Sequence, residues 1–197
     1  MSILLVRHGE TALNAARVVQ MPDTPLNSRG VEQARRLARR LKDHPVGLIL
    51  CSDQTRARMT ADEILGATGA PLRIDPLLQE RSFGEFRGTA YSDLEVDIFA
   101  PGCEPPGGES WETFHQRVDR AWERVELHAA RTGGDLVVVS HGLVCRSLAE
   151  RRLELEREVA VWPNACLTRI EGGPPWIADP VACTAHLDGD PALSGIA

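Results

Sequence analysis

The sequence lacks the features of disulfide-bonded, zinc-stabilised and membrane-anchored proteins. Its five cysteines include no Cys-x-x-Cys pair, and an odd number cannot all pair within one chain, which disfavours a disulfide scaffold and a structural zinc site. The N-terminal apolar run extends only from Ile3 to Val6 before charge begins, so it fits neither a signal peptide nor a membrane anchor. We therefore expect a cytoplasmic protein without a membrane partner.

Lysine is almost absent, since Lys42 is the single lysine among 22 basic residues. The 28 acidic residues outnumber them and give a net charge of −6, which disfavours nucleic acid as a partner. A length of 197 residues with 43% hydrophobic composition predicts one domain spanning residues 1–197, with a sizeable core. The sequence leaves the oligomeric state open, a homodimer included.

Short apolar runs alternate with amphipathic segments along the chain. The runs Ile3–Val6, Val46–Cys51 and Leu136–Val139 are typical of buried parallel strands. Helical periodicity follows at about 28–41, 54–65, 110–131 and 143–153, the second of these helices being closed by Gly66 and Gly69. The alternation predicts an α/β fold, a three-layer sandwich whose mostly parallel central sheet carries helices on both faces. The segment from Cys166 to Leu187 is expected to add edge strands.

The alternation breaks down between Gly84 and Ser110, where prolines and glycines accumulate. We expect an irregular excursion at about 85–110 that forms a lid, with a short helical piece within Tyr91–Phe99. Residues 89–116 contain no lysine or arginine, and their acidic residues are Asp93, Glu95, Asp97, Glu104, Glu109 and Glu112.

Two of the predicted strands run into a His-Gly pair, at His8 and at His141. Ligands of open α/β sheets bind at the carboxyl ends of the strands, so both imidazoles meet in one pocket if these strands are neighbours. The glycine after each histidine removes a side chain where a ligand must approach the backbone. Either histidine alone would be interpreted as a loop or core residue, whereas two at equivalent strand ends favour a site.

Arginines accompany these histidines. Arg7 precedes the first histidine, and Arg56 follows the second predicted strand. A guanidinium group stays charged and matches the edge of a tetrahedral phosphate. The pattern therefore predicts a small positive pocket for a phosphate group inside an acidic protein.

Six segments, in this order, resemble the histidine phosphatase superfamily, which has the phosphoglycerate-mutase-like fold. They are LLVRHGETALN, TPLNSRGVEQA, CSDQTRARMTA, LLQERSFGEFRG, PPGGESWETF and VVVSHGL, and they cover roughly residues 1–150. The resemblance implies that His8 is the nucleophile and forms a phosphohistidine intermediate. It also implies that Glu80 is the general acid that protonates the leaving oxygen.

The remaining site residues implied by the resemblance bind phosphate. Charge on the equatorial phosphoryl oxygens must be stabilised during transfer. Arg7, Arg56 and His141 would hold these oxygens, and Asn14 would be a further donor. Glu10 belongs to the motif, but we expect it only to fix the loop through hydrogen bonds.

We predict a phosphatase of the histidine acid type that hydrolyses a small phosphate monoester without a metal or other cofactor. Mutases of the family must hold a second anionic group, and the acidic lid would repel it. The apolar side chains of the lid favour a neutral or partly apolar leaving group, although Arg17, Arg81 and Arg87 could accept a carboxylate at the rim. The alternatives are a cofactor-dependent phosphoglycerate mutase and a noncatalytic binder of phosphorylated ligands. A metallohydrolase is disfavoured because H-x-H and H-E-x-x-H spacings are absent.

Overall fold

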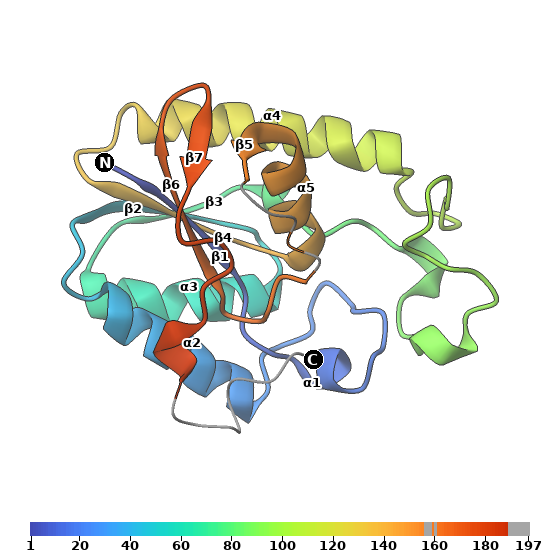
Figure 1. The fold of residues 1–197 in the computed structure, drawn as a ribbon. Coiled ribbons are helices and arrows are strands. Elements are labelled where there is room, and N and C mark those ends of the chain that lie inside the picture. The colour runs from blue at the N-terminus through green and yellow to red at the C-terminus, as the bar shows by residue number, and fades with distance from the viewer. Residues whose placement is uncertain (156–158, 160, 189–197) are drawn as a thin grey trace.

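The computed structural model describes residues 1–155, 159 and 161–188, and a seven-stranded sheet runs through their centre (Figure 1). The strand order is β3-β2-β4-β1-β6-β7-β5. Parallel pairs join β1 to β4 and β2 to both β3 and β4, whereas β6 is antiparallel to β1 and β7. The strands are β1 (Ile3–Arg7), β2 (Val46–Cys51), β3 (Leu72–Ile74), β4 (Asp135–Ser140), β5 (Leu153–Glu154), β6 (Leu167–Gly172) and β7 (Trp176–Ala178).

Helices cover both faces of the sheet (Figure 1). One face packs against α2 and α3, the other against α4 and α5. Alternate residues of β1 serve the two cores, because Leu4 and Val6 point to α2 and α3 while Ile3 and Leu5 point to α4 and α5. The predicted three-layer α/β sandwich is therefore confirmed. The helices are α1 (Ala12–Ala15), α2 (Ser28–Leu41), α3 (Thr55–Thr68), α4 (Trp111–Ala129) and α5 (Gly142–Arg152).

Local capping sets the ends of the long helices. The side chain of Asn27 accepts a hydrogen bond from the backbone N–H of Gly30 at the start of α2, and Ser110 does the same for Thr113 at the start of α4. The predicted end of α3 was too early, because Gly66 lies within the helix. Gly69, with a φ of 68°, is the residue that ends it.

The expectation for the C-terminal strands needs a correction. Strand β6 is not an edge strand, because it lies between β1 and β7 and pairs with β1 from Ile3 to Val6. Strand β3 was not predicted, since it has only three residues and two of them are exposed. Both cases reflect tertiary pairing that the local pattern does not encode.

The segment at about 85–110 has no long element. The expected helical piece within Tyr91–Phe99 is limited to a 3₁₀ turn at Tyr91–Asp93. Buried Arg81 holds this segment in place, because its guanidinium donates to the carbonyls of Ile98, Cys103 and Glu109. The same group lies 4.0 Å from the ring centre of Trp111. Arg81 is therefore a structural anchor of the lid, because each of its three guanidinium nitrogens donates to a lid carbonyl.

No helix in the part of the chain that the structure describes is long and apolar enough to cross a membrane.

Candidate active site

The two His-Gly pairs meet at the carboxyl ends of β1 and β4. These strands are parallel neighbours in which Arg7 is the register partner of Ser140, and the backbone N–H of His8 donates to the Ser140 carbonyl over 3.0 Å. The ring centroids of His8 and His141 lie 5.1 Å apart, edge to face. Both histidines are buried. The predicted convergence of the two imidazoles is confirmed.

The hydrogen bonds of His8 define which of its nitrogens is available for chemistry. Nδ1 lies 2.7 Å from the Gly9 carbonyl oxygen, which can only accept, so Nδ1 carries the proton. Nε2 lies 3.2 Å from Nε of Arg56, which can only donate, so Nε2 carries a lone pair. Burial, and then the charges of Arg56 and Arg7, hold the pKa of His8 well below its ordinary value. His8 is therefore a neutral imidazole with a nucleophilic Nε2 at neutral pH.

The loop after His8 owes its shape to helix packing. A Cβ at Gly9 would lie 2.5 Å from the Gly30 carbonyl oxygen, so Gly9 is required by the close approach of α2. The expectation that Gly9 makes room for a ligand is wrong. Buried Glu10 accepts hydrogen bonds of 2.8 Å from Asn27 and from Arg29, which confirms its expected role in fixing the loop.

Two arginines project toward the histidines from different elements. Arg7 is the last residue of β1 and donates to the Trp162 carbonyl, while its Nε is buried without a partner among the described residues. Arg56 lies in the first turn of α3 and donates to the Met21 carbonyl as well as to His8. Burial lowers the pKa of Arg56 to about 10, so the guanidinium remains charged at neutral pH. Both groups are suited to bind phosphoryl oxygens beside His8.

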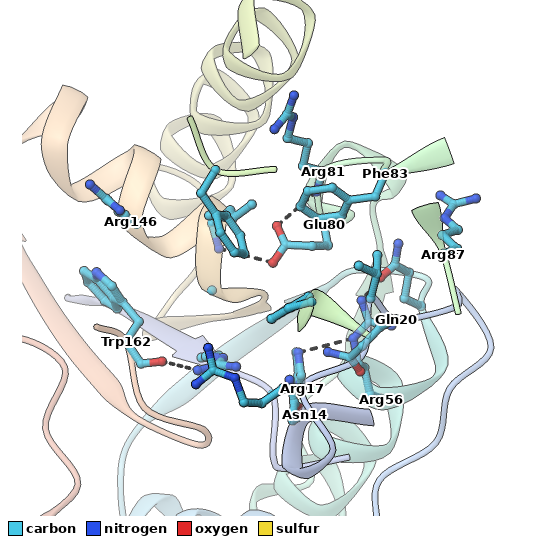
Figure 2. A pocket seen from close by; sticks show the side chains of 18 of the residues that line it. Asn14, Arg17, Gln20, Arg56, Glu80, Arg81, Phe83, Arg87, Arg146 and Trp162 are labelled. Carbon is cyan, nitrogen blue, oxygen red and sulfur yellow. Dashed lines mark hydrogen bonds between the residues drawn. The ribbon is translucent and has the colours of Figure 1, made fainter. Parts of the chain in front are cut away.

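Glu80 is a partly buried residue whose carboxyl group lines the same cavity. Its oxygens accept the backbone N–H groups of Arg81 and of Leu143, the latter in the first turn of α5, over 3.0 and 3.2 Å (Figure 2). Burial raises the pKa of Glu80 above its ordinary value, and this effect exceeds the opposing hydrogen bonds and the charges of Arg56 and Arg7. The group is thus able to retain a proton to higher pH than an exposed glutamate, as a general acid requires.

Asn14, the third residue of α1, also lines the cavity. Its Oδ1 accepts hydrogen bonds from the Thr11 backbone and from Asn164. Because the oxygen is occupied by donors, the amide nitrogen is the atom that Asn14 can offer to a ligand. This geometry suits the predicted role as a phosphate donor.

Ser52 is a site residue that the sequence pattern did not reveal. It directly follows β2, is fully buried, and its Oγ lies 2.9 Å from Nε2 of His141. The backbone N–H of Gln54 donates to the same hydroxyl, whose own proton can be donated to Nε2 of His141. In that arrangement the proton of the neutral ring lies on Nδ1, which is buried and has no partner among the described residues. The sequence signal that could have identified Ser52 is its position directly after β2, the strand that pairs with β4.

A cavity of about 390 Å³ is lined by Arg7, His8, Asn14, Arg56 and Glu80 (Figure 2). The fully buried side chains of His141 and Ser52 are not among the lining residues. Its lining includes the aromatic side chains of Phe83, Tyr91, Phe99 and Trp162. Glu80 is the one acidic side chain among the described lining residues, against six arginines, Arg7, Arg17, Arg56, Arg81, Arg87 and Arg146. None of the acidic residues of segment 89–116 is among them. The expectation that an acidic lid faces the substrate is wrong, because these carboxylates lie elsewhere; Glu109, for example, pairs with Arg117 at 2.7 Å.

A family model of the histidine phosphatase superfamily (branch 1) matches residues 3–174. The chain belongs to the histidine phosphatase superfamily. Relatives named as phosphatases and as mutase-like proteins both match it. The adenosylcobalamin/alpha-ribazole phosphatase of Salmonella typhimurium is 34% identical over 165 residues, which are 79% of this chain and 81% of the relative. The phosphoglycerate mutase-like protein 4 of Arabidopsis thaliana is 33% identical over 207 residues, covering 94% and 86%.

Solved structures of histidine phosphatases agree with the fold. The mycobacterial glucosyl-3-phosphoglycerate phosphatase superposes with a TM-score of 0.78 at 26% identity, over 90% of this chain and 97% of that one. The phosphoglycerate-mutase-like fold expected from the sequence is thereby confirmed. Among the described residues of this histidine phosphatase, no three His, Cys, Asp or Glu side chains are grouped as a metal ion would require.

Substitution of Ser52 tests its action through His141. We expect Ser52→Ala to lower kcat for a phosphate ester about tenfold, because the hydroxyl that fixes the His141 tautomer is lost. The pH dependence of kcat should change as well, since the imidazole proton is no longer assigned to Nδ1. Ser52→Thr, which keeps the hydroxyl, should restore much of the activity. An Ser52→Ala enzyme with an unchanged kcat and pH profile would show that the hydroxyl only fills space.

Proposed function

We propose that this chain is a metal-independent phosphomonoesterase that works through a phosphohistidine on His8. The observation that carries the proposal is the neutral His8 ring, whose Nε2 lone pair lies against Arg56 in a cavity that is also lined by the carboxyl group of Glu80. Nucleophile, charge stabilisation and proton donor are thus available within one site.

In the first half of the reaction, Nε2 of His8 attacks the phosphorus atom of the ester. The P–O bond to the leaving group breaks as the N–P bond forms, and the proton of Glu80 passes to the leaving oxygen. The Nδ1–H···O=C bond to Gly9 supports the positive charge that develops on the imidazole ring. Arg7, Arg56 and His141 donate to the equatorial oxygens, and Asn14 adds a further amide donor.

In the second half, water replaces the alcohol in the cavity. Glu80, now ionised, accepts a proton from this water as its oxygen attacks phosphorus. The N–P bond breaks, inorganic phosphate leaves, and His8 returns to its neutral form. No step requires a metal ion or an organic cofactor.

Hydrolysis rather than isomerisation is supported by the relatives named as phosphatases. The alternative is phosphoglycerate mutase activity, which the mutase-like relative keeps open. Both activities are measured on the same preparation, as phosphate release from phosphate monoesters and as interconversion of 2- and 3-phosphoglycerate. We expect phosphate release to be the faster reaction and to be undiminished by EDTA. Faster interconversion would favour the mutase, and loss of activity in EDTA would contradict metal independence.

We further propose a small phosphorylated molecule as the substrate, a single domain over residues 1–197 and a cytoplasmic location. The cavity volume of about 390 Å³ suits a small ligand. The seven strands of the described residues belong to one sheet, which supports one domain. Cys51, Cys145 and Cys166 are buried free thiols, as is common in reducing compartments.

A further inference from the structure

General acid catalysis requires the Glu80 carboxyl group to lie at the leaving oxygen, yet Glu80 belongs to no helix or strand. It follows a 3₁₀ turn at Pro76–Leu78 and precedes the lid. Its carboxyl oxygens accept backbone N–H groups, so the direction of the side chain depends on where the loop backbone lies (Figure 2). A displacement of about 1 Å can slow catalysis about 10²-fold. The contacts that hold this loop therefore matter for the reaction.

Arg117, in the second turn of α4, reaches this loop with its guanidinium group. Its Nη1 donates to the carbonyls of Leu77 and Gln79 over 2.9 and 2.8 Å. Its Nη2 donates to the carbonyl of Glu80 itself over 3.3 Å. One side chain from a long helix thus binds three backbone carbonyls at and just before the catalytic acid.

Glu109, at the end of the lid, orients Arg117. Nε and Nη2 of Arg117 donate to the two carboxylate oxygens of Glu109, both over 2.7 Å, in the bidentate geometry that guanidinium and carboxylate groups favour. A guanidinium group has five N–H donors, and these five hydrogen bonds use all of them. Lysine, with three donors on one nitrogen, could not make the same set.

Glu109 also holds the loop on the far side of Glu80. Its Oε2 accepts the backbone N–H of Ser82 over 2.8 Å, and its own N–H donates to the Ser82 carbonyl over 2.8 Å. Burial favours the neutral acid, but the hydrogen bonds from Arg117 and Ser82 outweigh it and lower the pKa of Glu109. The side chains of Arg117 and Glu109 are only 12% and 16% exposed, so this ion pair is shielded from water. We call the pair the loop clamp.

The two charges of the loop clamp offset each other. An arginine alone beside Glu80 would stabilise the carboxylate and lower its pKa, against the need of a general acid. The ionised Glu109 compensates that charge. The loop clamp can therefore fix the backbone around Glu80 without adding a net charge next to it.

We propose that Arg117 and Glu109 are positioning residues of the proposed phosphatase, which aim the Glu80 carboxyl group at the leaving oxygen by holding the backbone of residues 77–82. This inference rests on the proposed function, in which Glu80 protonates the leaving group. Neither Arg117 nor Glu109 is among the described residues that line the cavity. Loss of the loop clamp should therefore impair the protonation step and leave phosphate binding and the attack by His8 intact.

Two esters with similar aromatic groups test this selectivity. They are benzyl phosphate, whose alkoxide needs a proton to leave, and 4-nitrophenyl phosphate, whose phenolate does not. Arg117→Gln should lower kcat/KM for benzyl phosphate about 10- to 100-fold and that for 4-nitrophenyl phosphate no more than about threefold. Glu109→Gln, which leaves Arg117 without its carboxylate, should show the same pattern more weakly. Arg117→Lys keeps the charge and some donors, and should restore part of the rate on benzyl phosphate.

A matched control and a folding check accompany these variants. Arg120→Gln removes the same charge from an exposed position of the same helix and should leave both rates unchanged. The loop of Arg117→Gln remains tied by the Gln79 amide, which donates to Asp53 over 2.8 Å, so we expect the variant to fold. Circular dichroism and thermal unfolding check this. If Arg117→Gln does not fold, Arg117→Lys is compared with the wild type on the same two esters.

A double variant shows whether Arg117 acts through Glu80. In an enzyme that already carries Glu80→Gln, no acid remains to be positioned. Adding Arg117→Gln, or Arg117→Lys in its place, should then slow benzyl phosphate hydrolysis by no more than about twofold. A residue that only maintained the fold would slow the Glu80→Gln enzyme as strongly as the wild type.

The outcomes separate this inference from the proposed function. If the Arg117 variant slows both esters equally, keeps its full effect in the Glu80→Gln enzyme, or hydrolyses benzyl phosphate at the wild-type rate, the positioning role is wrong and the phosphatase stands. If the wild-type enzyme hydrolyses neither ester, the proposed function itself fails.

Discussion

Replacement of His8 by alanine is expected to lower kcat for phosphate ester hydrolysis by at least about 10⁴-fold, because no other group in the site supplies the attacking nitrogen. The remaining arginines still bind the phosphate group, so substrate affinity should fall far less than kcat. His8 is buried but faces the cavity, and an alanine there leaves the packing between the sheet and its helices in place. Rates are measured by phosphate release, and folding by circular dichroism and thermal unfolding.

Replacement of a histidine outside the cavity is the matched control for the His8 variant. His128 lies near the end of α4, outside the cavity lining, so His128→Ala should retain wild-type turnover. Turnover near the wild-type level in folded His8→Ala would end the proposed mechanism. If His8→Ala does not fold, His8→Asn is measured instead. This variant keeps a polar side chain of similar reach and should be equally inactive.

Glu80→Gln should slow hydrolysis of alkyl phosphates about 10²- to 10³-fold but that of 4-nitrophenyl phosphate only a few-fold. The alkoxide is a poor leaving group and needs a proton in the transition state, whereas nitrophenolate leaves without one. The amide keeps the shape of the carboxyl group, and its oxygen can still accept the N–H groups of Arg81 or Leu143. The measurement is kcat/KM over a series of esters with alcohols of rising pKa. Equal slowing across the series would assign Glu80 a structural role only.

The pH profile carries a second signature of the same group. Burial raises the pKa of Glu80, so the protonated acid persists above the range of an exposed glutamate and is lost as pH rises through its folded-state pKa. Activity on alkyl phosphates should therefore decline on the alkaline side, and Glu80→Gln should lack this decline. The pKa of His8 is depressed, so protonation of the nucleophile should limit activity only well below pH 6.5.

The site residues that directly follow a predicted strand could be predicted from the sequence. His8 and His141 each end an apolar run before a glycine, and parallel pairing of β1 with β4 brings them together. Arg56 could be predicted in the same way, because it follows β2 in the sequence. Glu80 follows no such strand, and only the family resemblance singled it out.

The features that could not be predicted depend on where side chains lie in the folded protein and on contacts between residues far apart in the sequence. The clustering of acidic residues in the lid segment predicts that they line the cavity, yet none of them is among the described lining residues. Arg81 looked like a rim cation but is enclosed by the carbonyls of Ile98 and Cys103. Ser52 went unnoticed because a serine after a strand is common, and its importance comes from one contact with His141.

The measurement that tests the account most directly is detection of the covalent intermediate. The protein is mixed with a ³²P-labelled phosphate ester, quenched within milliseconds to seconds in alkali, and digested for mass spectrometry. We expect phosphate on the peptide that contains His8, stable in alkali and released by acid, and absent from His8→Ala. Rapid turnover without any acid-labile phosphate on His8, or with the label on another residue, would contradict the account.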